Sequence, residues 1–170
     1  MTSTKKISIS AVLIALGITI PMFMPKVTIP PASYTIASHV PVFVAMFVSP
    51  SVAIAVTLGT AFGFFMSTPF VIALRALSHL VFAILGSLYI QEHRDIINDK
   101  RQMFIFNLGI GLIHAVVECA VVALFYFFGP MGNNIDYFKV VFLMIGVGGF
   151  IHSIVDFLIA QIVVSKTAQI

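Results

Sequence analysis

The feature that most constrains this chain is a succession of long apolar runs with only short polar connections between them. A run such as "LIHAVVECAVVALFYFF", residues 112–128, is typical of a helix that crosses a bilayer. In a soluble domain about a quarter of the residues are charged, whereas 9% of the residues of this chain are charged. We therefore expect an all-α integral membrane protein. Barrel strands would alternate between polar and apolar residues, and these runs do not.

Hydropathy divides the chain into six apolar segments, so we expect a bundle of six transmembrane helices in a single domain, residues 1–170. The segments are 6–24, 38–49, 50–66, 69–91, 103–128 and 137–165. The second segment is short and contains Pro41, so it is either a half-span or a helix that begins earlier, near Ala32. The first segment could also be a signal peptide, but no small-x-small cleavage site follows it, so we expect a retained helix.

The distribution of basic residues predicts that both termini are cytoplasmic. With that orientation, six basic residues lie inside and two outside, which satisfies the positive-inside rule. The inner residues are Lys5, Lys6, Arg94, Lys100, Arg101 and Lys166, and the outer ones are Lys26 and Lys139. The basic balance reflects this topology. No interleaving of aromatic and basic residues suggests a nucleic-acid partner.

The chain contains no motif of a soluble enzyme class. It has no glycine-rich phosphate loop, no Gly-x-Ser-x-Gly and no His-Glu-x-x-His, so we expect no ATP hydrolysis by the chain itself, no cofactor and no metal. The single cysteine, Cys119, lies inside a span, where a small apolar filler is the usual role.

Three successive spans carry ionisable residues in pairs. The pairs are Arg75 with His79, His114 with Glu118, and His152 with Asp156. Each is spaced i, i+4, so each pair lies on one face of its helix. Because charged groups at membrane depth normally face the bundle interior or a wet cavity, we expect the three faces to converge.

The depth of these residues, at about 1.5 Å per residue, gives the expected shape of the polar column. Arg75 lies nearest the outer surface, roughly 9 Å down, and Asp156 deepest, at roughly 28 Å. His79 is expected level with Glu118, and His114 level with His152. The polar residues could simply hold helices together, but six ionisable groups on three helices favour a functional cavity. Asp156 is the exception: it is interpreted as a neutral acid or a structural partner of His152.

Two features lie outside this column. Ala11 and Ala15 form an AxxxA spacing in the first helix, which allows close approach of another membrane helix. The loop between the first two segments, "PKVTIPPASYTIASH", carries Tyr34 and is either a lid over a cavity or an ordinary connector.

In these features the chain resembles an S-component, the substrate-binding membrane subunit of an energy-coupling factor transporter. The resemblance rests on its small size, its six segments, the AxxxA spacing at Ala11 and Ala15 and the polar second half. The stretches "PPASYTIASHVPVFVAMFVSP", residues 30–50, and "RALSHLVFAILG", residues 75–86, look most like the niacin-specific branch.

The resemblance implies a non-enzymatic, multi-pass protein of the bacterial plasma membrane that takes part in vitamin uptake. An S-component binds its vitamin near the outer face, under the loop between spans one and two. It then docks, through small residues of the first helix, on a T-component membrane subunit that works with two cytoplasmic ATPases. Carried over, Ala11 and Ala15 become docking residues and the outer part of the polar column becomes the vitamin site.

Nicotinate fits the chemistry of that column. Arg75 can pair bidentately with a carboxylate, His79 or His114 can hydrogen-bond a pyridine nitrogen, and Tyr34 or a neighbouring phenylalanine can stack on the ring. His152 is a further expected substrate-binding residue. Glu118 would orient an imidazole or balance Arg75; if it neutralises Arg75 outright, a neutral ligand fits better. Alternatives are an S-component for another vitamin, a small proton-coupled carrier that uses the histidines as a relay, and an intramembrane enzyme. His114 and Glu118 alone are a poor zinc motif.

Overall fold

A computed structural model of the chain describes residues 1–29, 32–128, 136 and 138–167. Pro30 and Pro31, which begin the first niacin-like stretch, lie outside the described residues, as does residue 137, where the sixth predicted segment begins. Along the chain, the elements are α1 (Ser3–Phe23), β1 (Lys26–Ile29), β2 (Ala32–Thr35), α2 (Val40–Val48), α3 (Pro50–Ser67), α4 (Phe70–Ser78), α5 (Leu80–Glu92), η1 (Arg94–Asn98), α6 (Lys100–Phe128), η2 (Phe138–Gly148) and α7 (Gly149–Thr167).

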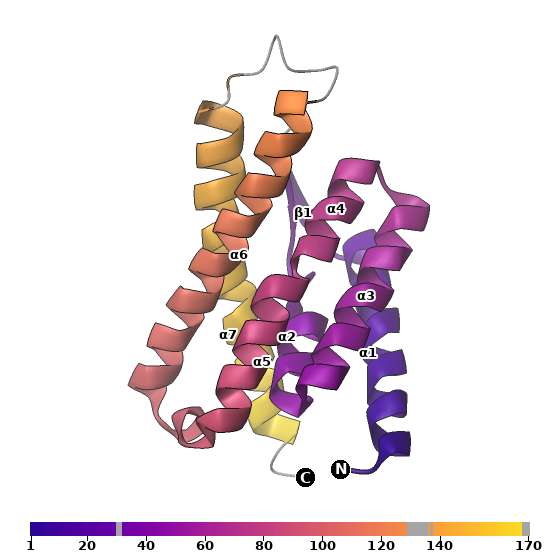
Figure 1. Cartoon of the computed structure of the whole chain (residues 1–170), viewed down its shortest axis with the longest axis vertical. Coiled ribbons are helices and arrows are strands. Elements are labelled where there is room, and N and C mark those ends of the chain that lie inside the picture. Colours follow the sequence, from indigo (N-terminus) through magenta and orange to yellow (C-terminus); the bar gives the residue numbers. More distant parts are fainter. Residues whose placement is uncertain (30–31, 129–135, 137, 168–170) are drawn as a thin grey trace.

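The helices run side by side in one bundle, and the two termini lie at the same end of it (Figure 1). In the described part of the chain, five helical stretches are long and apolar enough to cross a membrane. α4 and α5 form one of these, and η2 with α7 another. The predicted all-α, multi-pass membrane architecture is therefore confirmed.

The second predicted segment is the one that does not cross. α2 has nine residues, which reach about 14 Å, less than half of the roughly 30 Å hydrocarbon core. The half-span interpretation is therefore correct, and a helix beginning near Ala32 is wrong, because Ala32 lies in strand β2. α2 can be short because its residues are almost all covered by the surrounding helices.

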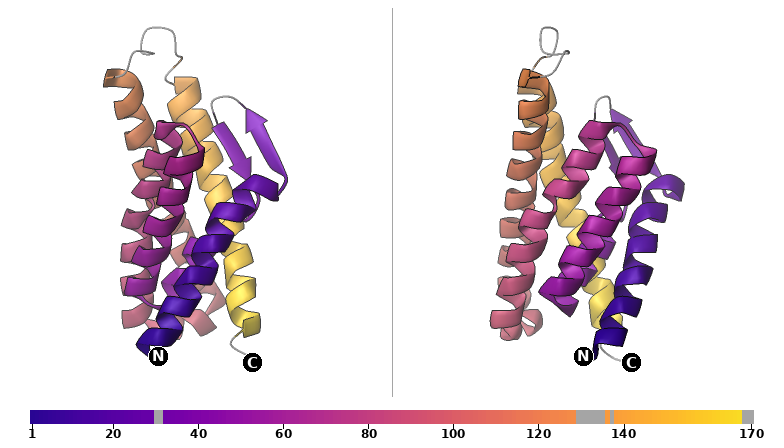
Figure 2. Two further views of the ribbon diagram at one scale, coloured as in Figure 1. Left: turned by 90° about the vertical axis from the view of Figure 1, so that its right-hand side faces the viewer. Right: turned by 45° about the vertical axis from the view of Figure 1, so that its right-hand side comes forward.

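The connection between α1 and α2 folds into a hairpin. β1 and β2 pair antiparallel, with Lys26 opposite Thr35 and Val27 opposite Tyr34. The hairpin lies beside the bundle in the half away from the termini (Figure 2). The chain thus leaves α1 in this half, forms the hairpin, and then enters α2, which is buried in the bundle.

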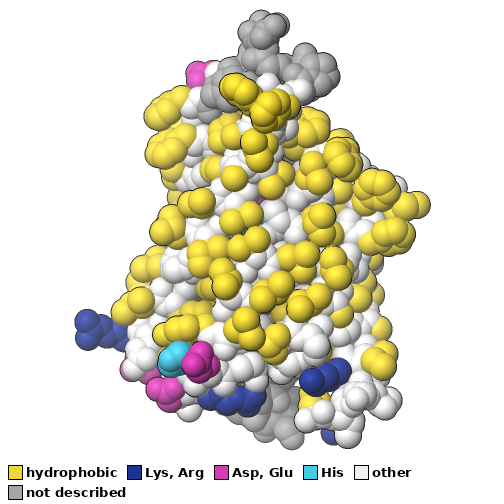
Figure 3. All heavy atoms as spheres, viewed as in Figure 1, with side chains coloured by type: hydrophobic (Ala, Val, Ile, Leu, Met, Phe, Trp, Pro, Cys, Tyr) yellow, Lys and Arg dark blue, Asp and Glu magenta, His cyan; other side chains and the backbone are white. Residues whose placement is uncertain are grey.

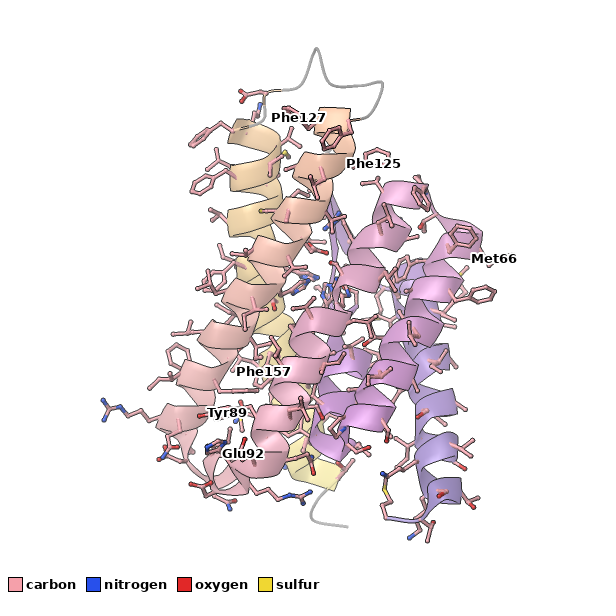
Figure 4. The ribbon with its side chains drawn as sticks, viewed as in Figure 1. Met66, Tyr89, Glu92, Phe125, Phe127 and Phe157 are labelled. Atoms are coloured by element: carbon pink, nitrogen blue, oxygen red, sulfur yellow. The ribbon has the colours of Figure 1, made fainter. Side chains whose placement is uncertain are left out.

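The surface and the interior of the bundle are both apolar, as a lipid environment requires. Large apolar side chains cover the middle of the face seen in Figure 3, and the dark-blue lysines and arginines lie toward the end with the termini. Inside, Phe43, Phe82 and Phe157 are fully buried, with Phe43 5.3 Å from each of the other two rings between centroids. Figure 4 shows Tyr89 and Glu92 in the half with the termini, and Met66, Phe125 and Phe127 in the opposite half.

α1 joins the bundle by packing on glycines of α3. A Cβ at Gly59 would lie 2.6–2.9 Å from three side-chain atoms of Ile14. This contact makes α1 part of the bundle, as expected of a retained first helix. Ala11 and Ala15 face away from it and are exposed.

The close approach of α1 to α3 generates a stability prediction. Gly59→Ala should lower the thermal unfolding temperature in detergent, because the added Cβ would overlap the stiff, β-branched side chain of Ile14. Overpacking costs about 1 to 3 kcal/mol, and the middle of that range exceeds the gain of about 1 kcal/mol in helix propensity.

Gly109→Ala is the matched control, because nothing lies within 4 Å of a Cβ there. Circular dichroism should show that Gly109→Ala melts at or above the temperature of the parent chain. A Gly59→Ala variant that melts as Gly109→Ala does would contradict the contact.

Candidate functional site

A break in the third long span sets the position of the first two site residues. α4 ends at Ser78 and α5 begins at Leu80, so His79 stands at the junction of the two helices. The Ser78 hydroxyl donates to the Arg75 carbonyl at 2.7 Å, a local hydrogen bond of the kind that bends helices. Arg75 and His79 both line the central cavity.

A buried ion pair joins α4 to α6. Arg75 Nη2 lies 3.0 Å from Glu118 Oε2, and the two side chains are 15% and 4% exposed. A carboxylate buried at this depth would be unstable without such a partner. The Nε atom of Arg75 is also buried, and it makes no hydrogen bond within the described part of the chain. The ion pair therefore leaves donors of Arg75 uncommitted.

The other oxygen of Glu118 faces two imidazoles. Glu118 Oε1 lies 3.1 Å from His79 Nε2 and 3.6 Å from His114 Nε2, and the two ring nitrogens are 3.2 Å apart. With neutral imidazoles, a single Nε2–H of His79 would be shared between Glu118 Oε1 and the lone pair of His114 Nε2. The His114 Nδ1 atom is buried and has no partner among the described residues. Both Nε2 atoms therefore face the same carboxylate oxygen.

Asp156 of α7 fixes the start of α2. Its carboxylate accepts hydrogen bonds from the backbone N–H groups of Ala37 at 2.8 Å and of His39 at 2.9 Å. A negative charge is favourable at the N-terminus of a helix. It also holds Ala37 in the left-handed conformation, at φ 66°, which is costly for a residue with a Cβ. Asp156 thus explains how the half-helix begins at mid-depth.

The same carboxylate orients His39, which the sequence interpretation missed. His39 Nδ1 lies 3.1 Å from Asp156 Oδ2. The His39 ring lies edge-on to the rings of His79, His114 and His152, at centroid distances of 4.8, 4.7 and 4.9 Å. Hydropathy put His39 at the outer end of a span. The half-span alternative, in which the second helix begins inside the bundle, would have placed His39 near the other histidines.

The hairpin closes the cavity on one side. The Tyr34 hydroxyl donates to the Met144 carbonyl of η2, and the Tyr34 ring lies 5.7 Å from the His152 ring in an edge-on arrangement. A Cβ at Gly148 would overlap the Tyr34 ring, so glycine is required at this contact. Burial raises the pKa of the Tyr34 hydroxyl, with a smaller lowering by Arg75 and a smaller rise from Glu118. Tyr34 is therefore a neutral hydroxyl at physiological pH.

These groups surround a cavity of about 210 Å³. This volume is below the range of about 300 to 1,000 Å³ of pockets for drug-sized ligands, so a molecule with one ring fits best. All six residues proposed from the sequence line it, namely Tyr34, Arg75, His79, His114, Glu118 and His152. His39, Ser38 and Lys26 line it as well.

His79 and Glu118, which were expected at one level, are hydrogen-bonded. Asp156 does have His152 as a partner, at 3.5 Å, but its closer bonds go to the residues before α2. Cys119 donates to the Val141 carbonyl at 3.2 Å.

The chain is similar to one characterised transport protein. It is 42% identical over 167 residues to the niacin transporter NiaX of Lactococcus lactis subsp. cremoris (strain MG1363). The match covers 94% of this chain and 75% of that protein. No family model and no solved structure matches the chain.

The role of Asp156 can be tested by its removal. Asp156→Ala should destabilise the chain by about 3 to 5 kcal/mol, because it leaves buried donors without an acceptor. Asp156→Asn should cost less, since the amide oxygen still accepts one of the hydrogen bonds.

Thermal unfolding in detergent measures both variants, with Asp95→Ala as the control. Asp95 is exposed, so its loss should change the stability by no more than about 0.5 kcal/mol. Equal melting of Asp156→Ala and Asp95→Ala would show that Asp156 does not hold α2 in place.

Proposed function

Because the chain belongs to the niacin-transporter family of energy-coupling factor S-components, we propose that it captures niacin, in the form of nicotinate, for uptake. The whole chain, residues 1–170, acts as one substrate-binding membrane domain. The observation that carries the proposal is the cavity built on the Arg75–Glu118 pair, in a chain with this similarity to a niacin transporter.

Arg75 is the proposed anchor for the nicotinate carboxylate. Glu118 occupies only Nη2 at 3.0 Å, so the guanidinium keeps donors for a second carboxylate. Charge-assisted hydrogen bonds of this kind are stronger in a cavity that excludes water. Because Glu118 balances much of the Arg75 charge, the same site has a measurable affinity for the neutral amide, nicotinamide, although a lower one.

The ring of the vitamin fits between the hairpin and the histidines. Tyr34 offers an aromatic face, and aromatic pairs prefer the edge-on or offset geometry that a single ring can adopt here. His152, which lies beside Tyr34, is suited to hydrogen-bond the pyridine nitrogen. The remaining histidines form the floor of the site.

The proposed entrance is at the end of the bundle away from the termini. Both termini are proposed to be cytoplasmic, in agreement with the basic residues at that end (Figure 3). The β1–β2 hairpin then lies at the outer side, and Lys26 at its base is exposed and lines the cavity. A cation at the mouth attracts an anionic vitamin. The hairpin would act as the lid.

The chain is proposed to work with a T-component membrane subunit and two cytoplasmic ATPases. Ala11 and Ala15 support this assignment because they are exposed on α1 and allow a partner helix to approach closely. Two neighbouring hydroxyls on the same helix are satisfied within it: Ser8 donates to Thr4 and Thr19 to Ala15. These two hydroxyls therefore need no hydrogen-bond partner from another subunit.

Calorimetric titration of the detergent-solubilised chain tests the capture of niacin. Nicotinate should bind in a one-to-one ratio, and Arg75→Ala should weaken it ten- to a hundredfold, in line with about 1.5 to 3 kcal/mol for a hydrogen bond to a charged group. Arg94→Ala, on an exposed arginine, is the matched control and should bind normally. Binding of another vitamin in preference to nicotinate would overturn the proposed substrate.

Co-purification with a T-component and its ATPases tests the docking surface. Ala11→Leu and Ala15→Leu should each reduce recovery of the complex at least tenfold, because a bulky side chain prevents close helix approach. Nicotinate binding should not change. Gly109→Leu, which adds the same side chain to an exposed position of α6, is the control. Normal recovery of the alanine variants would mean that α1 is not the docking helix.

A further inference from the structure

The floor of the cavity has the geometry of a metal site, and we infer that it binds one divalent transition-metal ion of the zinc type. The proposed ligands are His39, His79, His114 and Glu118. One ligand atom from each residue lies within 4.8 Å of all the others. This binding site goes beyond niacin capture, and it does not require a vitamin to be present.

The spacing of three of the four ligand atoms is close to that around a tetrahedral ion. Metal–ligand distances of about 2.0 to 2.2 Å give ligand–ligand edges of about 3.3 to 3.6 Å. The three edges among His79 Nε2, His114 Nε2 and Glu118 Oε1 are 3.1, 3.2 and 3.6 Å. A cation at their centre would take the lone pairs of both nitrogens, and the carboxylate oxygen would complete the same face of the ion.

Two of the proposed ligands are held by charged partners behind them. His39 Nδ1 faces Asp156 at 3.1 Å, which leaves Nε2 for a metal. A carboxylate–histidine–metal chain of this kind orients the ligand in many metalloproteins. The second oxygen of Glu118 is held by Arg75 at 3.0 Å. Two of the four ligands, His39 and Glu118, are therefore held by charged side chains that do not themselves contact the metal.

The charges around the buried part of the cavity favour a cation. Arg75 is positive, whereas Glu118 and Asp156 are both negative, so one negative charge is in excess when the histidines are neutral. If nicotinate binds, which rests on the proposed function, the excess becomes two. A divalent ion balances this charge, and its own cost of burial is met by the imidazoles and the carboxylate.

This site was not predicted from the sequence because its ligands come from different elements of the fold. Only His114 and Glu118 share one, and that pair alone is a poor zinc motif. His79 stands at the α4–α5 junction, and His39 is the residue before α2. The expectation that the chain holds no metal followed from the spacing along the chain, which does not reveal a site assembled in space.

Titration of the chelator-treated, detergent-solubilised chain with Co²⁺ and with Zn²⁺ tests the inference. We expect saturable one-to-one binding and an intense visible Co²⁺ spectrum of tetrahedral type, reversed by Zn²⁺. His114→Gln and His39→Gln should each weaken Zn²⁺ binding at least tenfold. His93→Gln is the matched control, because His93 lies outside the cluster, beside Tyr89, and should leave binding unchanged.

Absence of saturable binding to the parent chain, or equal binding in His114→Gln, would overturn the metal site. The spectrum of the parent chain does not depend on how well a variant folds. Titration of the metal-free chain with nicotinate separates the two proposals. Nicotinate binding without any metal binding would keep niacin capture and reject the metal site. Metal binding without nicotinate binding would keep the metal site and reject niacin capture.

Discussion

The ion pair between Arg75 and Glu118 is the interaction on which the rest of the site depends. At membrane depth neither charge is stable without a partner, so the pair fixes α4 against α6 at one level of the bundle. Glu118 then has one oxygen left for His79 and His114, and Arg75 has donors left for a ligand. A single pairing thus creates an anion anchor on one side and a group of imidazoles on the other. The shape and the charge of the cavity follow from it.

A second carboxylate, Asp156, performs the corresponding task for α2. A nine-residue helix cannot cross a bilayer and would begin with unsatisfied backbone donors in an apolar interior. Asp156 accepts from the backbone N–H groups of Ala37 and His39, directly before the helix, and orients His39 in the same contact. Irregular backbone at membrane depth is tolerated only where it is buried in protein or lines a cavity, and here both conditions hold. The half-helix is therefore the element that brings the fourth histidine to the centre.

Much of this could be predicted from the sequence because membrane helices obey simple rules. Length and apolarity predict the five long spans, and the i, i+4 spacing of Arg75 with His79 and of His114 with Glu118 predicts that these faces meet. His39 was missed because its position depends on where a short helix begins, which is decided by a hydrogen bond to Asp156, 117 residues away. The hairpin was missed because hydropathy does not report that two short strands pair with each other. It also does not report the hydrogen bond that Tyr34 donates to a carbonyl of η2.

The central proposal is that a vitamin occupies the cavity between the hairpin and the histidines. An experimental structure of the chain with bound nicotinate tests this most directly. We expect the carboxylate on the guanidinium of Arg75, the ring beside Tyr34, and the pyridine nitrogen toward His152. Nicotinate bound elsewhere on the chain, with the Arg75–Glu118 cavity empty, would contradict it.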